Sequence, residues 1–194
     1  MTRRFSIKPT LTLRGRTFKG LRGFAGKPAH PPLTDIPVAA YILVAVFDVV
    51  SYVAGAGTSE GRELFVAGSY VIIAGAFVSL FTAATGFWDW LKSTEPGTQA
   101  RRTANTHMAA MLTVTAIVIA DVIVRITEWD HPSTSTLVLA LSVAAGLLVA
   151  VGAAYGGSLV FEYGFNVETA GDHPAWHVSE TDVFPGDPGG STSA

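Results

Sequence analysis

Four long apolar stretches, separated by short polar breaks, dominate the pattern of hydrophobic and polar positions along the chain. They cover about residues 36–57, 65–91, 106–129 and 137–163. A helix of about 20 mainly apolar residues is long enough to cross the hydrocarbon core of a bilayer. Soluble helices are seldom this long and apolar several times in succession. The pattern therefore predicts an all-α integral membrane four-helix bundle.

The segments outside these stretches divide the chain into three parts. Residues 1–33 form a basic juxtamembrane arm, 34–167 the four-helix membrane domain, and 168–194 a tail rich in Gly, Pro, Ser and Asp. We expect the two terminal segments to be disordered. Pro37 is expected to open the first helix, because a first-turn proline loses no hydrogen bond. The first stretch is too long for a cleaved signal peptide and contains Asp48, so we expect it to remain as a span.

The composition agrees with a membrane location and narrows the chemistry. Only 14% of the residues are charged, compared with about 25% in typical soluble domains. Cysteine is absent, which excludes disulfides, thiolate metal sites and cysteine nucleophiles. The sequence also contains no GxSxG, Walker or HExxH motif, so it gives no support to a hydrolase and favours a protein that is not an enzyme.

The net charge of −2 hides an uneven distribution of bases. Of 13 Lys and Arg residues, eight precede residue 30, and Lys92, Arg101 and Arg102 lie between the second and third stretches. Positive residues favour the cytoplasmic side, and four spans return the chain to the side where it started. We therefore expect both termini in the cytoplasm. The excess of Arg over Lys and the many Ala, Val and Gly residues are typical of a high-GC bacterium, which makes the inner (plasma) membrane the expected location.

The basic arm has two interpretations. It can adhere to anionic lipids, at about 1 kcal/mol per basic residue near the surface. Alternatively, its charges only set the topology. In both interpretations the partner is the lipid bilayer, and no nucleic-acid partner is predicted.

One face of the third stretch carries ionisable groups that we expect to point into the bundle. Steps of three and four residues place on that face His107, Met111, Val114, Val118, Asp121 and Arg125. Asp48 lies at a depth comparable to that of Asp121 and Arg125, in the half of the membrane opposite to the termini. We therefore predict a buried cluster of Asp48, Asp121 and Arg125. This cluster either neutralises charge and fixes helix register or belongs to a proton or ion path, although the apolar middle of the face interrupts such a path.

The other membrane face collects the residues that are most suggestive of a ligand site. Topology brings to it His30, Asp89, His107 and Glu162. Neutral imidazoles and carboxylates suit a transition metal, and two histidines from separate helices suit a b-type haem. The alternative is that these residues cap helix ends or pair with neighbouring bases. His173 and His177 in the tail share helical spacing, but Pro174 argues against a helix there.

Small residues indicate where helices approach closely, because packing drives helix association in lipid. In the second stretch they are Gly68, Gly75, Ser79, Thr82 and Gly86. The fourth stretch carries Gly152 and Gly156 as a GxxxG pair. These faces predict either tight packing within one chain or a homodimer.

The motifs at the span ends resemble the DUF2231 family of small bacterial membrane proteins. They are HPPLTDIPVA before the first span, ATGFWDW at the end of the second, and GGSLVFEYGFNV at the end of the fourth. The resemblance extends over about residues 29–168. It implies a four-helix membrane domain without an assigned reaction. It also implies His30, Asp89, His107 and Arg125 as the positions to test.

Some members of that family are joined to Rieske-type iron–sulfur domains, which implies a link to electron transfer. Because this chain has no cysteine, such a role requires a separate redox protein partner. The leading hypothesis is a multi-pass inner-membrane protein that holds haem or a metal and is accessory to membrane electron transfer. The alternatives are a non-catalytic scaffold or accessory subunit, and a small ion or proton transporter that uses the buried charges.

Overall fold

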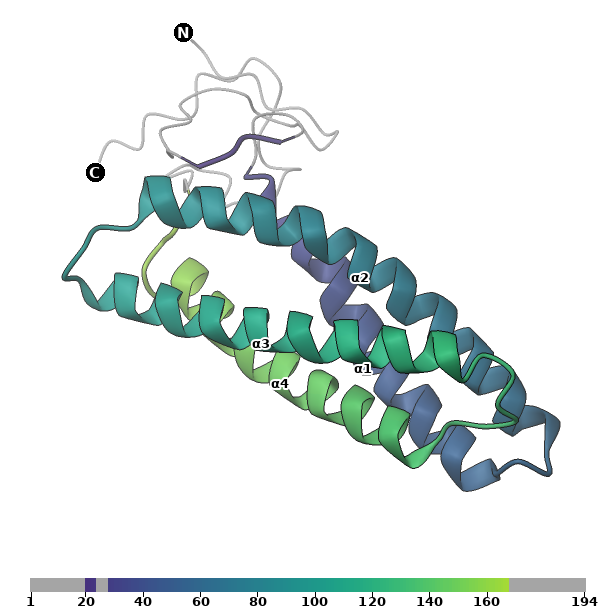
Figure 1. The fold of residues 1–194 in the computed structure, drawn as a ribbon. Helices are drawn as coiled ribbons and strands as arrows, with labels where there is room; N and C mark the ends of the chain where they lie inside the picture. Colours follow the sequence, from purple (N-terminus) through teal and green to yellow (C-terminus); the bar gives the residue numbers. More distant parts are fainter. Residues whose placement is uncertain (1–19, 24–27, 168–194) are drawn as a thin grey trace, which may run out of the picture.

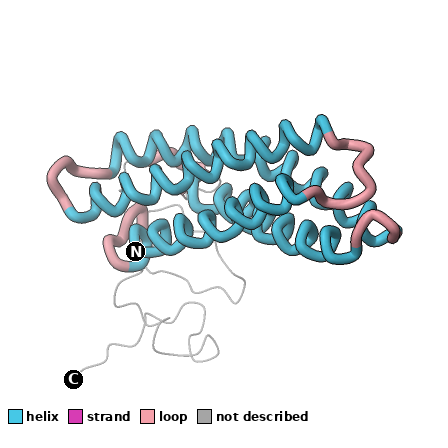
Figure 2. Tube along the Cα trace, turned by 60° about the horizontal axis from the view of Figure 1, so that its bottom comes forward, coloured by secondary structure: helices cyan, strands magenta, loops and turns pink. Residues whose placement is uncertain are grey.

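The computed structural model describes residues 20–23 and 28–167, which form four α-helices that run up and down beside one another (Figure 1). The helices are α1 (His30–Ala54), α2 (Ser59–Ser93), α3 (Gln99–Thr127) and α4 (Thr136–Phe161). Figure 2 shows that loops occur only at the two ends of the bundle, and no strand is present in the described ranges. The predicted all-α four-helix fold is thus confirmed. The predicted disorder of the tail lies outside the described residues.

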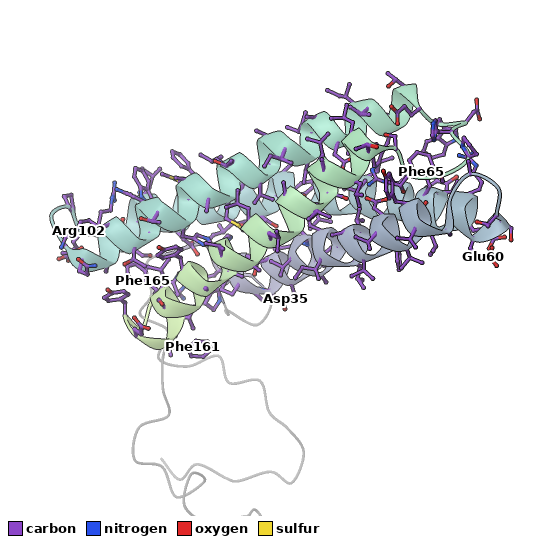
Figure 3. All side chains as sticks on the ribbon, turned by 90° about the horizontal axis from the view of Figure 1, so that it is seen from below. Asp35, Glu60, Phe65, Arg102, Phe161 and Phe165 are labelled. Atoms are coloured by element: carbon purple, nitrogen blue, oxygen red, sulfur yellow. The ribbon has the colours of Figure 1, made fainter. Side chains whose placement is uncertain are left out.

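All four helices are long and apolar enough to cross a membrane. Their outward faces carry many large apolar side chains, including Phe77, Leu80 and Leu147. Figure 3 draws the side chains on the ribbon and labels another exposed one, Phe161. The interior is narrower and consists mainly of valines, with Ile72 and Tyr41 among them. An apolar outside around a small packed inside is what a bilayer, rather than water, stabilises.

Side-chain caps set where three of the helices begin. The hydroxyl oxygens of Thr58, Thr98 and Ser135 accept hydrogen bonds from backbone N–H groups three residues further on. Each cap satisfies a donor that has no partner within its own helix. Helices α2 and α3 therefore start well before the apolar stretches that mark them in the sequence.

The start of α1 differs from the prediction. Pro31 and Pro32 occupy the first turn, where the missing N–H groups cost nothing, and Pro37 lies inside the helix rather than at its start. Because Pro37 has no N–H group, the carbonyl of Leu33 loses its usual partner within the helix. The hydroxyl of Thr82 in α2 donates to that carbonyl at 3.2 Å. A neighbouring helix therefore compensates the internal proline, as is common in membrane proteins.

The helices pack as two hairpins. Helix α1 contacts α2 most extensively and α3 contacts α4, whereas α2 and α3 contact each other much less, although they follow one another in the chain. The hairpins meet mainly through α1 and α4. We call the end where α1 and α3 begin the histidine end, and the end where they finish the arginine end. The described chain enters and leaves the bundle at the histidine end (Figure 1).

Candidate functional site

At the arginine end, the structure brings Asp48, Asp121 and Arg125 together. All three side chains are 0% exposed. Arg125 Nε donates to Asp121 Oδ1 at 2.8 Å, and Arg125 Nη2 donates to Asp48 Oδ2. The pairing joins α3 to α1, and so it joins one hairpin to the other. A buried arginine with two carboxylates is stable only when its geometry and remaining hydrogen bonds are good.

The other polar atoms of this cluster also have partners inside the protein. Arg125 Nη1 donates to Ser69 Oγ in α2 at 3.3 Å. Asp48 Oδ1 accepts from the Thr134 hydroxyl, which reaches it from the α3–α4 connection at 3.0 Å. The phenyl ring of Phe65 lies 5.7 Å from the guanidinium carbon. Every helix or its adjoining loop therefore contributes to a closed network.

The geometry of the cluster favours a structural role over an ion path. Its charged groups are paired with one another, and the next layers of the bundle are built from apolar residues such as Val44, Val114 and Val118. The core between the two ends also contains the Tyr41 hydroxyl, but it is hydrogen-bonded to Ser79 at 2.6 Å and lies among apolar residues, which do not form a continuous path for a proton or ion. A fully satisfied buried network instead fixes register and rigidifies the fold.

At the histidine end, the structure brings His30 and His107 together. Their ring centroids lie 6.5 Å apart and the ring planes meet at 78°. His30 Nδ1 is 3.0 Å from the carbonyl oxygen of Thr82, and His107 Nδ1 is 2.8 Å from that of Gly152. A carbonyl oxygen only accepts hydrogen bonds, so each Nδ1 carries the proton in the neutral ring. Each Nε2 is then the nitrogen with the free lone pair.

No hydrogen bond engages either Nε2 within the part of the chain that the structure describes. Both rings are partly buried. The site therefore presents two oriented nitrogen lone pairs that bond to no other described residue.

A glycine makes room for each imidazole. A Cβ atom on Gly86 would lie 2.6 Å from His30 Cε1, and one on Gly156 would lie 3.1 Å from His107 Cε1. In both hairpins, the glycine comes one helical turn after the carbonyl that holds the ring. The spacing from His30 to Asp48 in α1 also equals the spacing from His107 to Arg125 in α3. The two hairpins thus repeat the same arrangement with different residues.

The two carboxylates predicted for this end have other partners. Asp89 is buried and accepts from the Leu21 N–H at 2.8 Å and from Asn166 Nδ2 at 3.1 Å, so it ties the segments before α1 and after α4 to α2. A Cβ on Gly20 would lie 2.2 Å from Asp89 Oδ1. Glu162 is exposed and accepts from the Ser158 hydroxyl. Neither Asp89 nor Glu162 forms a common ligand set with the two histidines in this structure. Their role as ligands stays a prediction.

Among the described residues, no group of three or more His, Asp or Glu side chains could hold a metal ion. The histidine pair alone supplies two nitrogen donors. A protein-bound transition metal usually needs three or four ligands from the protein. A metal that brings its own equatorial ligands needs only two axial ones.

Residues 26–169 match the family of predicted membrane proteins described as DUF2231. The chain belongs to this family. No curated protein and no solved structure matches it. Membership in DUF2231 together with the four candidate spans establishes a multi-pass membrane protein, and no activity accompanies the family description.

Several residues that build these sites in the DUF2231 chain are not evident from its sequence. The carbonyls of Thr82 and Gly152 hold the histidines, and a backbone carbonyl leaves no trace in the residue pattern. Gly86 and Gly156 stand out in the sequence only as small residues between helices. The apolar stretch that starts at about residue 106 predicts His107 near the start of its helix, but α3 begins at Gln99, so the histidine lies two turns inside it. The pair His173 and His177 lies outside the described residues.

Proposed function

We propose that this protein binds a b-type haem between its two helical hairpins through His30 and His107, and that it is accessory to electron transfer in the membrane. The observation that carries the proposal is the matched pair of imidazoles, each held through Nδ1 by a backbone carbonyl and each with a free Nε2. Bound haem would supply one-electron exchange. The residues of the chain would bind and orient it.

The donor set suits this ligand. Histidines that bind metals usually donate their second ring N–H to a carbonyl or carboxylate, which fixes the tautomer and raises the basicity of the ligating nitrogen. Both His30 and His107 have this arrangement. Many structural histidines also donate a ring N–H to a carbonyl and bind no metal. Here, however, two histidines with this hydrogen bond converge from different hairpins.

The distance between the rings also fits one metal between them. With nitrogen–metal bonds of about 2 Å, two imidazoles on opposite sides of a metal place their centroids roughly 6 Å apart. The separation of the His30 and His107 centroids is 6.5 Å. A bare transition metal with further ligands from solvent is the alternative occupant. Haem is favoured because the porphyrin supplies the equatorial ligands that the described residues lack.

The charge distribution supports the cellular setting of this proposal. In the sequence, the bases of the arm precede α1 and those of the α2–α3 connection follow α2, and these two helix ends lie at the histidine end. By the positive-inside rule, these bases support a cytoplasmic histidine end, in keeping with our proposal of the bacterial plasma membrane as the location and anionic lipid beside the arm. Because the chain has no cysteine, the electron donor or acceptor would be a separate redox protein.

The test is the visible absorption spectrum of the full-length protein, purified in detergent after expression with adequate haem supply, in its oxidised and dithionite-reduced forms. We expect a Soret band that shifts on reduction, and its loss in His30→Ala and in His107→Ala. The matched control is His131→Ala, because His131 lies in the loop at the opposite end and its side chain bonds only to the nearby Ser133 carbonyl. This variant should keep the full spectrum.

Two results would decide against haem. A colourless protein with about one equivalent of a transition metal, lost in both histidine variants, would identify a bare metal site. A colourless and metal-free protein of native size would leave a scaffold or accessory subunit, in which the histidines only join helices. A Soret band that remains in both His30→Ala and His107→Ala would show that other residues of the chain bind the haem.

A further inference from the structure

We infer, on the basis of the proposed haem site, that Gly86 and Gly156 together with the carbonyls of Thr82 and Gly152 are positioning elements that hold the two axial imidazole planes nearly perpendicular. The planes of His30 and His107 meet at 78°. The proposed function requires only that both histidines ligate. The inference adds that the protein imposes one particular orientation on them.

Each ring is restrained by two contacts from the partner helix of its own hairpin. The Nδ1 hydrogen bond fixes the direction in which the ring points. The glycine leaves the space in which the ring lies in this orientation, because a Cβ there would come within 2.6 Å of His30 Cε1 or 3.1 Å of His107 Cε1. An imidazole that turns away from its carbonyl would lose the Nδ1 hydrogen bond.

The angle between the planes is set by how the hairpins pack. His30 is held by α2, and His107 is held by α4. The hairpins are joined through the contact between α1 and α4 and by the Arg125–Asp48 pair at the far end. A relative rotation of the rings would therefore require the two hairpins to shift, which the closed charge network resists.

The orientation of axial imidazoles has a direct electronic consequence. In low-spin ferric haem, parallel imidazole planes increase the energy difference between the two iron d orbitals that interact with the ligands. The electron paramagnetic resonance spectrum is then rhombic. Perpendicular planes make these orbitals nearly equal in energy, and the spectrum is then dominated by one feature at unusually low field. Second-shell contacts to axial ligands are the means by which a protein tunes such a centre.

The test is the low-temperature electron paramagnetic resonance spectrum of the oxidised full-length protein, beside Gly156→Ala and the matched control Gly157→Ala. We expect the single low-field feature in the wild type and in Gly157→Ala, where a Cβ meets only Phe161 at 3.9 Å. In Gly156→Ala the Soret band should remain, while the low-field feature moves toward a rhombic spectrum. The cause is the added Cβ, 3.1 Å from His107 Cε1 and 3.3 Å from Nδ1, which displaces the ring from its present orientation.

The outcomes separate this inference from the proposal on which it rests. Absence of a Soret band in the wild type overturns both. A Soret band with a rhombic wild-type spectrum keeps the haem site and overturns the perpendicular arrangement. An unchanged spectrum in Gly156→Ala overturns the positioning role of that glycine. Because the wild-type spectrum is decisive by itself, poor folding of Gly156→Ala would not leave the inference open.

Discussion

The two ends of the bundle use the same positions of α1 and α3 for opposite purposes. At the arginine end, Asp48 and Arg125 face each other, carry opposite charges and bind directly. At the histidine end, His30 and His107 occupy the corresponding positions, but each offers a lone pair at Nε2. Two lone pairs cannot bind each other without a proton or a metal between them. A polar pair that is complete in itself builds structure, whereas a pair of like donors is where a ligand is needed.

The same contrast appears in how the surroundings treat each pair. Ser69, Thr134 and Asp121 supply the additional hydrogen bonds that close the network around Arg125 and Asp48. Around the histidines, carbonyls and glycines fix the rings and leave one nitrogen of each open. The first environment satisfies the hydrogen-bonding groups of the ion pair, whereas the second only orients the imidazole rings. Variants at either end of the bundle can test this difference between a structural pair and a ligand-binding pair.

The largest effect is expected from Arg125→Met. This variant leaves two carboxylates buried without a cation, and breaking a buried ion pair in this way costs about 3–5 kcal/mol. We expect a large fall in the thermal unfolding midpoint in detergent, with loss of monodisperse protein on size exclusion. A midpoint equal to that of the wild type would show that the cluster does not hold the hairpins together.

The matched control neutralises the cluster as a whole. In the triple variant Arg125→Met, Asp48→Asn, Asp121→Asn no charge remains, and replacement of a whole buried ion pair is often close to neutral. Most of the stability should return, and the proposed haem spectrum should be unchanged because the histidine end is not altered. Loss of that spectrum in a well-folded triple variant would mean that the two ends are coupled.

An intermediate effect is expected from Thr82→Val. The variant removes the hydroxyl that donates to the Leu33 carbonyl, and such a loss costs about 0.5–1.5 kcal/mol. Pro37→Ala restores an N–H group within α1 for the same carbonyl, so Thr82→Val should cost less in that background. The control is Thr113→Val, because Thr113 is exposed and its hydroxyl bonds only to its own helix. Equal costs of Thr82→Val in both backgrounds, measured by thermal unfolding, would contradict this assignment.

The smallest effect is expected from Glu162→Gln. Its carboxylate is exposed and bonds only to Ser158, one turn earlier. Exposed substitutions of this kind usually change stability by less than about 0.5 kcal/mol. We therefore expect an unchanged unfolding midpoint and an unchanged absorption spectrum. Loss of absorption would instead identify Glu162 as a ligand, as the clustering of polar residues at this membrane face suggests.

The sequence predicts the fold well because a bilayer imposes a simple rule on composition. A span must be apolar over its whole length, so the four stretches are visible without any structural information. The helix ends are less visible, since hydrophilic caps such as Thr98 extend α3 beyond the apolar region. Pro31 and Pro32 look like breakers in the sequence, yet they form the first turn of α1.

The candidate sites are predictable only in part. The depth and helical spacing of Asp48, Asp121 and Arg125 point to one cluster, because ionisable groups in lipid need partners. Topology also places His30 and His107 at one membrane face, but it places Asp89 and Glu162 there as well. Only side-chain directions distinguish these residues. The carbonyls that hold the imidazoles, and the repeat that relates the hairpins, depend on backbone positions that any residue type can occupy.

The ion pair between the hairpins also bears on how the chain is made. Arg125 follows Asp48 by 77 residues, so α1 enters the bilayer before its cation has been synthesised. A lone charge in a span is unfavourable by about 2.5–3.5 kcal/mol at the helix centre on the scale of membrane insertion. Insertion of α3 relieves that penalty and draws the second hairpin onto the first. The pair would thus serve as a checkpoint in biogenesis, since a chain truncated before Arg125 keeps an unpaired carboxyl group in the membrane.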